Sequence, residues 1–318
     1  MNWRDTMPQV VLKLSNTKIL EMKSHYQSSL KNPPPGAVFA AKTPNSSITA
    51  YNSGKVLFQG KAPEIEANKW GKAKANTNNT SKKKGASVNS HSYAPSPTLF
   101  TSSHIGSDEA GTGDYFGPIT VAAAYVESSQ IPLLKEIGVK DSKNLTDDMI
   151  KSIAKKLLQM KIPYSLVILH NEKYNKLQNR GWSQGKMKTM LHHHAITKLL
   201  DKIAPTKPDG ILIDQFSQPN VYKNHLKTEK AKLQDKVYFM TKAESYSISV
   251  AAGSIIARAS FVNQMDKLSD QAGVTLPKGA SQKVDQVAAS IIKQDGKEAL
   301  DKIAKVHFAN TQKAEKYL

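Results

Sequence analysis

Cysteine is absent from this sequence of 318 residues. Its absence excludes disulfides, thiolate catalysis and cysteine-ligated zinc, and it suits a reducing cytoplasm, where we expect the protein to lie. Long apolar runs are missing too: no stretch approaches the roughly 18 residues of a membrane-spanning helix. The first residues, MNWRDTMPQVVLKL, also lack the basic-then-apolar pattern of a signal peptide. We therefore expect a soluble, unsecreted protein that has no membrane partner.

Acidic residues are scarce, with 26 Asp and Glu against 45 Lys and Arg, which gives a net charge of +19 and a pI near 9.7. The excess is densest at the start, because the first 100 residues carry 14 Lys and Arg against 4 Asp and Glu. Clustered basic side chains displace the counterions of a phosphate backbone, so nucleic acid is the partner that we expect. A merely soluble basic protein and a protein that binds acidic membranes are the alternatives.

Large aliphatic residues are almost missing from 71–98, which is rich in Lys, Asn, Ser, Gly and Pro. Such a segment cannot bury enough apolar surface to offset the entropy of ordering it. We predict a flexible linker there. It divides a small basic unit, 1–70, from a larger one, 99–318.

The small unit has the pattern of a curved antiparallel sheet backed by helices. Ser15 is a suitable N-cap for an amphipathic helix, and the breaker NPPPG follows that helix. Half of the sheet would face water or a ligand, and the charge favours an anionic ligand over a passively basic surface. The expected strands are 9–14, 37–43, 47–53 and 55–61, and the expected helices are 15–30 and about 62–70.

The large unit alternates apolar strands with helical stretches, which predicts a mixed sheet covered by helices on both faces. Active sites on such sheets gather where strands end. The expected strands are 104–111 and 118–126, as a hairpin, then 162–169, 210–214 and 237–240; the expected helices are 147–160, 183–204 and 245–268.

Four acids stand at the ends of these strands: Asp108, Glu109, Asp214 and Glu244, the last just before the final predicted helix. If they converge, they need a cation, because carboxylates a few ångströms apart raise one another's pKa. Oxygen ligands without cysteine indicate Mg²⁺ or Mn²⁺. Two such ions about 4 Å apart would activate a water and stabilise the leaving oxygen of a phosphodiester, which is the chemistry of a nuclease.

The adjacent pair raises a geometric condition, since neighbouring residues on a strand point to opposite faces. Asp108 and Glu109 can share a site only if the strand ends or bulges near them, and Gly111 and Gly113 permit either. The alternative is that Glu109 is an ordinary surface acid beside one functional aspartate.

Three other motifs have simpler interpretations. The spacing in GTGDYFG is G-x-G-x-x-x-G without a clear helix after it, and the acids before it would repel a pyrophosphate, so dinucleotide binding is disfavoured. The run of histidines at 192–194 would point in three directions on a helix, which favours a solvated helix face over a metal site. Thr146 has the position of an N-cap, with Asp147 and Asp148 in the first turn.

Five motifs occur in a fixed order: GSDEAGTGDYFGPITVAA, VKDSKNLT, ILIDQF, AESYSISVAAGSIIAR and LPKGAS. Together they resemble the type 2 ribonucleases H, and most closely the ribonuclease HIII branch, over about 99–290. The small basic unit resembles the TATA-box-binding-protein-like N-terminal domain of that branch. The resemblance implies an α/β protein, with an RNase H-like mixed sheet flanked by helices and a small α+β domain before it.

The resemblance also implies the reaction: metal-dependent endonucleolytic cleavage of the RNA strand of RNA/DNA hybrids, leaving 5′-phosphate and 3′-hydroxyl ends. The family's four catalytic, metal-binding acids correspond to Asp108, Glu109, Asp214 and Glu244. We expect two ions, Mg²⁺ or Mn²⁺, an RNA/DNA hybrid duplex as the partner, and a monomer.

The resemblance further assigns substrate contacts to Gly111, Thr112 and Gly113, because the family's glycine run meets the hybrid backbone and its 2′-hydroxyls. Main-chain groups can approach closely only where glycine stands, and the 2′-hydroxyl separates RNA from DNA. Lys143, in DSKNL, is the expected phosphate ligand near the acids, with a solvated lysine as the alternative.

Two positions depart from the related HII branch. Thr112 stands where HII enzymes have Arg or Lys, and Val262 stands about where their fourth acid falls. Both favour HIII, whose fourth acid is a glutamate. An HII-like enzyme that incises at single ribonucleotides in DNA is the alternative, and so is a non-catalytic nucleic-acid-binding protein.

Overall fold

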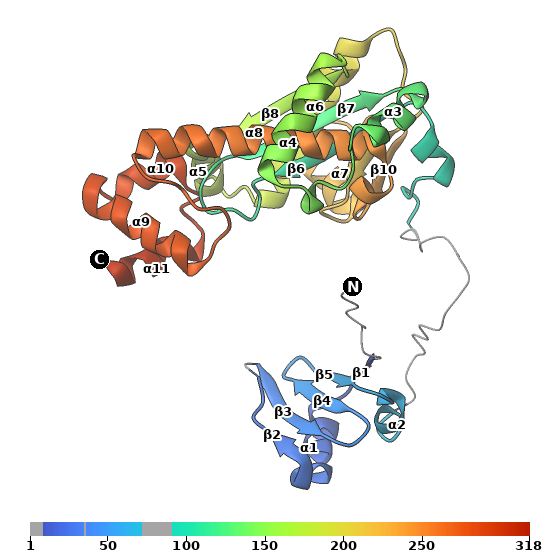
Figure 1. Cartoon of the computed structure of the whole chain (residues 1–318), viewed down its shortest axis with the longest axis vertical. Coiled ribbons are helices and arrows are strands. Elements are labelled where there is room, and N and C mark those ends of the chain that lie inside the picture. Colours follow the sequence, from blue (N-terminus) through green and yellow to red (C-terminus); the bar gives the residue numbers. More distant parts are fainter. Residues whose placement is uncertain (1–8, 35, 72–90) are drawn as a thin grey trace. The chain divides into compact units, whose positions relative to one another are not determined.

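The computed structural model describes residues 9–34, 36–71 and 91–318, and it divides into two compact units, Met1–Gly85 and Ala86–Leu318 (Figure 1). Of the predicted linker, 71–98, residues 72–90 lie outside the described residues. The residues directly after 90 pack within the second unit: the carbonyl of Tyr93 accepts a hydrogen bond of 2.9 Å from the amide of Phe239. The short helix η2, Pro97–Thr101, buries Leu99 in the same unit.

The first unit is an antiparallel sheet with helix α1 packed against one face, as the sequence predicted, but it has a fifth strand, β2, where the predicted helix 15–30 was expected to end. The side chain of Ser15 caps α1 by accepting from the amide of Lys18. Ile48 and Phe58 point from the sheet to the helix, whereas the other face keeps half-buried residues such as Thr49. The strand order is β1-β5-β4-β3-β2, with β1 Gln9–Lys13, β2 Leu30–Lys31, β3 Ala37–Lys42, β4 Ser47–Tyr51 and β5 Lys55–Gln59; the helices are α1 Asn16–His25, η1 Gln27–Ser29 and α2 Pro63–Ala67.

The second unit contains a mixed sheet, which confirms the predicted fold class. Strand β7 runs antiparallel to both of its neighbours, β8 and β6, whereas β6, β9 and β10 run parallel. The parallel strands therefore bring their carboxyl ends to one edge. The order is β10-β9-β6-β7-β8, with β6 His104–Ala110, β7 Ile119–Val126, β8 Tyr164–Leu169, β9 Ile211–Asp214 and β10 Val237–Met240.

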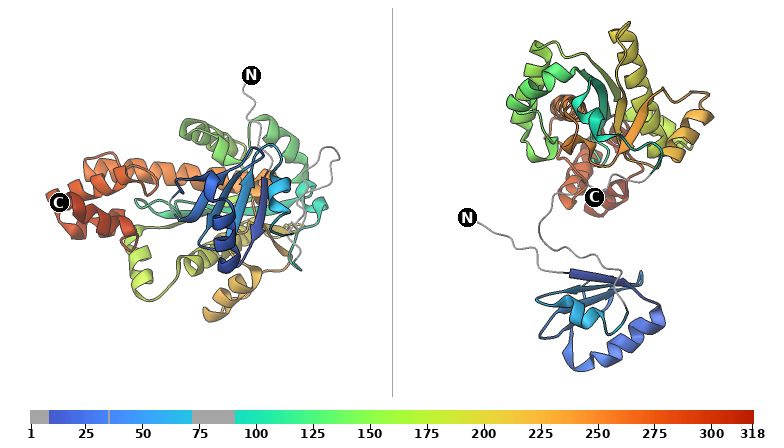
Figure 2. Two further views of the ribbon diagram at one scale, coloured as in Figure 1. Left: turned by 90° about the horizontal axis from the view of Figure 1, so that it is seen from below. Right: turned by 90° about the vertical axis from the view of Figure 1, so that its right-hand side faces the viewer.

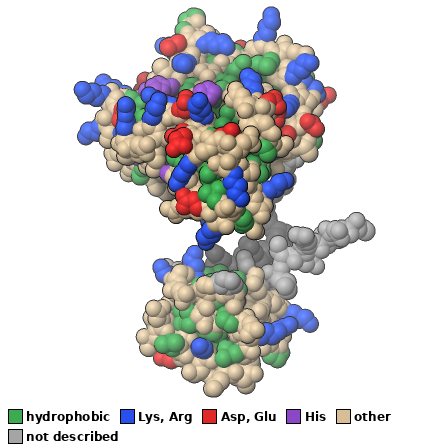
Figure 3. All heavy atoms as spheres, turned by 90° about the vertical axis from the view of Figure 1, so that its left-hand side faces the viewer, with side chains coloured by type: hydrophobic (Ala, Val, Ile, Leu, Met, Phe, Trp, Pro, Cys, Tyr) green, Lys and Arg blue, Asp and Glu red, His purple; other side chains and the backbone are tan. Residues whose placement is uncertain are grey.

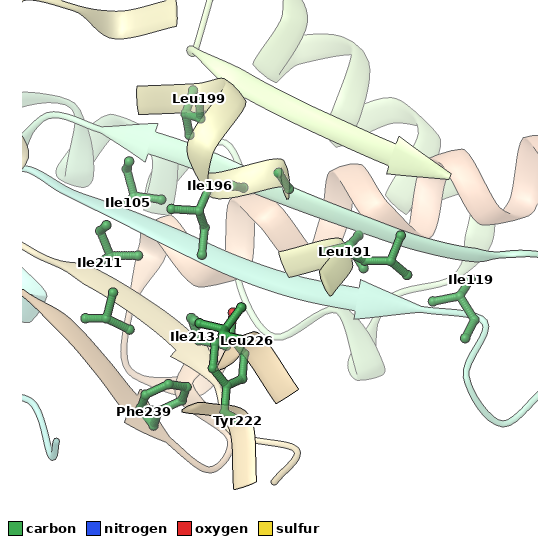
Figure 4. Close-up of a cluster of buried hydrophobic side chains, with 14 of the residues drawn as sticks. Ile105, Ile119, Leu191, Ile196, Leu199, Ile211, Ile213, Tyr222, Leu226 and Phe239 are labelled. Atoms are coloured by element: carbon green, nitrogen blue, oxygen red, sulfur yellow. The ribbon is translucent and has the colours of Figure 1, made fainter. Parts of the chain in front are cut away.

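Helices cover both faces of this sheet (Figure 2). Alternate residues of β7 enter two cores: Val121 and Ala123 pack toward α6, and Ala122 and Ala124 pack toward α8. Figure 4 shows the α6 core, in which Ile105 and Ile211 from adjacent strands lie beneath that helix. The helices on the α6 face are α5 Asn171–Asn179, α6 Gln184–Ile203 and α7 Pro219–Thr228; those on the α8 face are α3 Ile131–Glu136, α4 Asp147–Gln159 and α8 Ile248–Ala272, and the short turns are η3 Ser128–Gln130, η4 Ser142–Asn144 and η5 Ala243–Ser245.

Helix α8 lies unusually close to strand β6. A Cβ at Gly106 would stand 2.0 Å from the backbone nitrogen of Val250, and a Cβ at Gly253 would stand 3.1 Å from the carbonyl of Gly106. The small residues of α8 therefore let its backbone rest on the sheet, which fixes its first turns beside the strand ends. The helix begins at Ile248 and not directly after Glu244 as predicted, because η5 intervenes and Ser247 provides the cap.

The last part of the chain forms a cluster of helices that no sequence pattern predicted. They pack with the end of α8 around Tyr115 and Phe116, both fully buried in the loop between β6 and β7. In the described ranges, no helix is long and apolar enough to span a membrane. The helices are α9 Gln282–Asp295, η6 Lys297–Ala299, α10 Leu300–Ile303, α11 Ala309–Ala314 and η7 Glu315–Tyr317.

Candidate active site

The sheet brings the predicted acids to one edge. Strands β6 and β9 are parallel, and Ser107 pairs with Ile213, so the next residues, Asp108 and Asp214, are neighbours where the two strands separate. Strand β10 ends at Met240, and the turn η5 that follows it carries Glu244. The first three acids also influence one another's protonation, as described below.

Asp108 is buried beneath helix α8. Its Oδ1 accepts a hydrogen bond of 2.7 Å from the amide of Glu109. Burial, and then the charges of Glu109 and Asp214, raise the pKa of Asp108 well above its usual range, although the hydroxyl of Ser254 on α8 opposes the shift. Asp108 is therefore a carboxyl group that lacks a compensating positive charge.

Glu109 points to the opposite face, toward α6. The strand does not bulge: β6 pairs with β7 in unbroken register from His104 to Ala110, and it ends one residue after Glu109. Of the two conditions that the sequence analysis allowed, an ending and a bulge, the structure therefore shows the ending, and the two carboxylates approach the strand end from its two faces. The charge of Glu109 nevertheless raises the pKa of both Asp108 and Asp214, so the acids lie close together.

Two side chains from α6, Lys188 and His192, contact the carboxylate of Glu109. Its Oε1 lies 2.7 Å from Nζ of Lys188, and its Oε2 lies 3.0 Å from Nε2 of His192. Burial raises the pKa of Glu109, but the contacts with His192 and Lys188 outweigh it and lower that pKa to about 2. Glu109 is thus a fixed carboxylate and not a surface acid.

His192 corrects an expectation, since the sequence analysis placed all three histidines on a solvated helix face. Its side chain is fully buried, with Nδ1 2.7 Å from the hydroxyl of Ser107 and its ring stacked on Phe216. His193 is half-buried and His194 is exposed, so the three side chains do point in three directions. A signal was available: Lys188 and His192 are four residues apart, which places them on one face of the helix.

Asp214 and Glu244 complete the group. The amide of Ala243 donates to Oδ1 of Asp214 at 2.8 Å, while burial and the charge of Glu244 raise the pKa of Asp214 to about 7. Glu244 is almost fully buried, and its Oε1 accepts from Nζ of Lys143 at 2.6 Å. Its Oε2 is buried and has no hydrogen-bond partner among the described residues. An orphaned carboxylate oxygen beside other acids suits a bound cation.

Lys143 reaches this edge from the short turn η4. The carboxylate of Asp141 caps the turn, and the guanidinium of Arg258 donates to the carbonyls of Ser142 and Leu145. The hydrogen bond to Glu244 raises the pKa of Lys143, whose side chain is 70% exposed. The structure therefore places a solvent-facing ammonium group directly beside the acids.

The donors at this edge suit a hard divalent ion. Carboxylate oxygens from four residues are the ligands that Mg²⁺ and Mn²⁺ prefer, and no cysteine competes. In the ranges that the structure describes, no three side chains are already arranged as a ligand set. Glu109 and Glu244 instead face the ammonium groups of Lys188 and Lys143.

The glycine loop follows β6 directly. Gly111 adopts a φ of +86°, and a Cβ there would lie 2.2 Å from the carbonyl of Pro118, so the turn requires glycine. The carbonyl of Thr112 accepts from Nε2 of Gln184 at 3.1 Å. A Cβ at Gly113 would meet no atom within 4 Å. The fold therefore explains Gly111 but gives no reason for glycine at 113.

Comparison with known families assigns both units. Residues 105–311 match the family described as Ribonuclease HII, and residues 9–83 match a domain of unknown function, DUF3378. The first match covers the acids, the glycine loop and most of the C-terminal helices.

Individual relatives match over nearly the full chain. Ribonuclease HIII of Oceanobacillus iheyensis is 60% identical over 312 residues, which are 98% of this chain and 100% of the relative. Ribonuclease HIII of Bacillus mycoides is 55% identical over 306 residues, 96% and 97% of the two chains. The crystal structure of Bst-RNase HIII in complex with Mn²⁺ is 44% identical, with a TM-score of 0.68 over 97% of this chain and 98% of that one. The chain belongs to the ribonuclease HIII family.

Proposed function

We propose that this protein is a metal-dependent endonuclease that hydrolyses the RNA strand of RNA/DNA hybrids. The observation that carries the proposal is the group of four acids at one sheet edge, Asp108, Glu109, Asp214 and Glu244, directly beside the glycine loop. Ribonuclease HIII relatives share more than half of the sequence over nearly its whole length. The products are a 5′-phosphate and a 3′-hydroxyl.

The four acids would hold two divalent ions, Mg²⁺ or Mn²⁺. Three features support this: the orphaned Oε2 of Glu244, the raised pKa of Asp108, and the Mn²⁺ complex of a 44% identical relative. When bound, such ions activate a water and stabilise the oxygen that leaves the phosphodiester.

The protein's own contribution is to hold the ligands before the metal arrives. His192 and Lys188 fix the two oxygens of Glu109, and the amide of Ala243 fixes Asp214. Contacts of this kind set the direction of a ligand's lone pairs and spare the cost of ordering it on binding. The first turns of α8, pressed on β6 at Gly106, hold Ser254 against Asp108.

The substrate would lie across this edge. The backbone of Gly111, Thr112 and Gly113 would meet the hybrid and its 2′-hydroxyls, because a residue without a Cβ admits the closest approach. The absence of any fold-based reason for glycine at 113 supports a ligand there. The exposed ammonium of Lys143 would contact a phosphate.

The first unit would grip the duplex. Residues 1–70 would bind substrate, 71–98 would link the units, and 99–318 would be the catalytic domain; within 71–98, Tyr93 packs on the catalytic domain. Much of the chain's basic excess lies in the first 100 residues. On the second unit, Lys and Arg side chains are spread over the face visible in Figure 3, among fewer acidic ones. We expect the protein to work as a monomer in the cytoplasm.

Cleavage at a single ribonucleotide in DNA is the second candidate. Thr112, rather than Arg or Lys, and a fourth acid supplied by Glu244, with Val262 buried in α8, speak against it. The retention of all four acids speaks against a non-catalytic nucleic-acid-binding protein.

A panel of duplexes tests the proposal. The full chain is incubated with Mg²⁺ or Mn²⁺ and an RNA/DNA hybrid, a DNA duplex, or a DNA duplex with one embedded ribonucleotide. We expect cleavage of the hybrid and its abolition by EDTA. Equal cutting of the DNA duplex would overturn the proposal, and efficient incision at the single ribonucleotide would favour the second candidate.

A further inference from the structure

A fully buried lysine, Lys305, donates hydrogen bonds to carbonyls of the loop that follows β6. Nζ of Lys305, in the C-terminal helical cluster, donates to the carbonyl of Asp114 at 2.7 Å and to that of Gly117 at 2.6 Å. Asp114 comes directly after Gly113, so one of these bonds fixes the end of the G-x-G turn. Lys305 is separated from the loop by nearly 190 residues of sequence, and its side chain contacts none of the four acids by any described hydrogen bond or ion pair.

The backbone around Lys305 joins the same loop. The amide of Lys305 donates to the carbonyl of Tyr115 at 2.8 Å, and the amide of Gly117 donates to the carbonyl of Ile303 at 2.8 Å. The side chain of Asn171 also donates to the carbonyl of Gly117. The loop between β6 and β7 is thus tied to the C-terminal segment by hydrogen bonds in both directions.

The segment around Gly279 holds the loop from another side. The amide of Tyr115 donates to the carbonyl of Gly279 at 2.9 Å, and the amide of Gly279 donates to the carboxylate of Asp114 at 2.6 Å. The side chains of Tyr115 and Phe116 fill the core of the C-terminal cluster. Together these contacts show that the loop between β6 and β7 packs on the C-terminal helices and is hydrogen-bonded to them.

A lysine is an expensive residue to bury, which indicates that its donors are needed. Carbonyls in a loop have no strand partner, and an unpaired buried carbonyl costs free energy comparable to a lost hydrogen bond. The side chain of Lys305 carries at least two N–H groups whether or not it is protonated, and two carbonyls receive them. The charged or titratable groups around it are Asp114, Tyr174, whose ring centroid is 5.9 Å from Nζ, and His307.

We propose that Lys305 is a positioning residue for substrate recognition: it sets the backbone of Gly111–Gly113 for the hybrid, so that the C-terminal helices form part of the substrate site. The inference rests on the proposed function insofar as the loop contacts the hybrid. Gln184 supports the same loop from α6, through the carbonyl of Thr112. The acids are held by other residues, so the effect of Lys305 is on binding and not on the chemical step.

Two measurements on the full chain test this inference. The variant is Lys305→Met, which keeps an unbranched side chain and removes the donors, and the control is Lys302→Met, an exposed lysine on the same segment. We expect Lys305→Met to raise KM for the hybrid about tenfold while kcat stays within about twofold, because it removes binding that ground state and transition state share. Lys302→Met should match the wild type in both constants.

Amide hydrogen exchange gives the second measurement. In the wild type, the amides of Tyr115 and Gly117 should exchange as slowly as those of β6 and β7. In Lys305→Met, we expect their exchange to accelerate about tenfold or more while the strands keep their protection. A merely structural role would change stability everywhere and leave the ratio of KM to kcat unmoved.

The possible failures are distinguishable. A folded Lys305→Met protein with the wild-type KM, or a Lys302→Met protein with the same defect, would overturn the inference. Fast exchange at Tyr115 and Gly117 in the wild type would overturn it even if the variant cannot fold. If the wild type cleaves no hybrid, the proposed function fails, and an exchange effect confined to the loop would still establish Lys305 as its anchor.

Discussion

The imidazole of His192 stands against Glu109, with Nε2 3.0 Å from Oε2, on the face of β6 opposite to Asp108. Its other nitrogen lies 2.7 Å from the hydroxyl of Ser107 on the same strand, and its ring stacks on Phe216. The side chain therefore connects helix α6 to the strand that carries two of the acids. It leaves Glu109 one orientation, in which Lys188 holds the other oxygen.

Replacing this ring should weaken cleavage without unfolding the protein. His192→Phe keeps the stacking on Phe216 but removes both nitrogen contacts, so Glu109 loses a partner. Loss of an outer partner of a metal-binding carboxylate costs about 10- to 100-fold in metal affinity or activity. We expect such a loss in kcat/KM at limiting metal, partly restored by more metal. The exposed His194 gives the control, His194→Phe; equal activity of the two variants would contradict this role for His192.

Alanine substitutions at two glycines should have different effects, one on stability and the other on substrate binding. A Cβ at Gly106 would strike the backbone of α8, so Gly106→Ala should lower the free energy of unfolding by about 1–3 kcal/mol or more. A Cβ at Gly113 would meet nothing, so Gly113→Ala should change it by less than about 0.5 kcal/mol. Gly113→Ala should nevertheless raise KM for the hybrid. Urea unfolding and steady-state kinetics measure the two effects, and an unchanged KM would argue against a substrate contact at Gly113.

Removing 1–80 should weaken hybrid binding and leave the acids in place. The first unit has its own core, built from α1 and its sheet, and all four acids lie in the second. A chain without the basic side chains of this segment should release fewer counterions when it binds, so the slope of log affinity against log salt should become shallower. Titrations of a labelled hybrid at several salt concentrations measure both quantities. If the affinity and the slope equal those of the full chain, the first unit does not contribute to binding of the hybrid.

The lowered pKa of the buried Lys305 should make the stability of the protein depend on pH. Burial lowers the pKa of Lys305 to about 7 from 10.5, and the charge of Asp114 opposes the shift. Between these values the unfolded chain holds a proton that the folded chain lacks, so the free energy of unfolding rises with pH by up to about 1.4 kcal/mol per unit. Below about pH 7 both states hold the proton and this slope vanishes.

The variant Lys305→Met should lack that rise. Urea unfolding of both proteins from about pH 6 to about pH 9 should therefore show a stability difference that shifts in favour of the wild type as pH increases. Curves that stay parallel over this range would mean that the amine titrates in the folded chain as it does in water.

The sequence was sufficient to predict that the four acids lie at one sheet edge, because their position follows from chain topology. Asp108 and Asp214 end parallel neighbours, so reading where apolar strands stop also locates the edge where they meet. The mixed sheet and its covering helices followed from the alternation of strand and helix patterns. The start of α8 was missed by three residues, since the turn at Glu244 is set by tertiary contacts and by the cap at Ser247.

The partners of the acids and of the loop could not be predicted in the same way. His192 and Lys305 are polar residues, and polarity alone predicts exposure; only the fold shows that Glu109 and two loop carbonyls require them. Apart from α9, the C-terminal helices are short, and the burial of this cluster depends on Tyr115 and Phe116, which lie far away in the sequence. The sequence left open whether the strand ends or bulges at the acid pair; the structure shows a regular strand that ends at Ala110 and presents one acid on each face.

The central claim is that the acids at this edge perform metal-dependent cleavage of hybrids, and Asp108→Asn tests it most directly. The substitution keeps the size of the side chain and removes the carboxyl group of Asp108, whose pKa is raised by burial and by the charges of Glu109 and Asp214. Digestion and binding of one labelled RNA/DNA hybrid are measured with Mg²⁺ and with Mn²⁺, for the wild type and the variant. The account predicts cleavage by the wild type, none by Asp108→Asn, and binding by both. Cleavage that survives the substitution, or wild-type cleavage that needs no divalent ion, would contradict it.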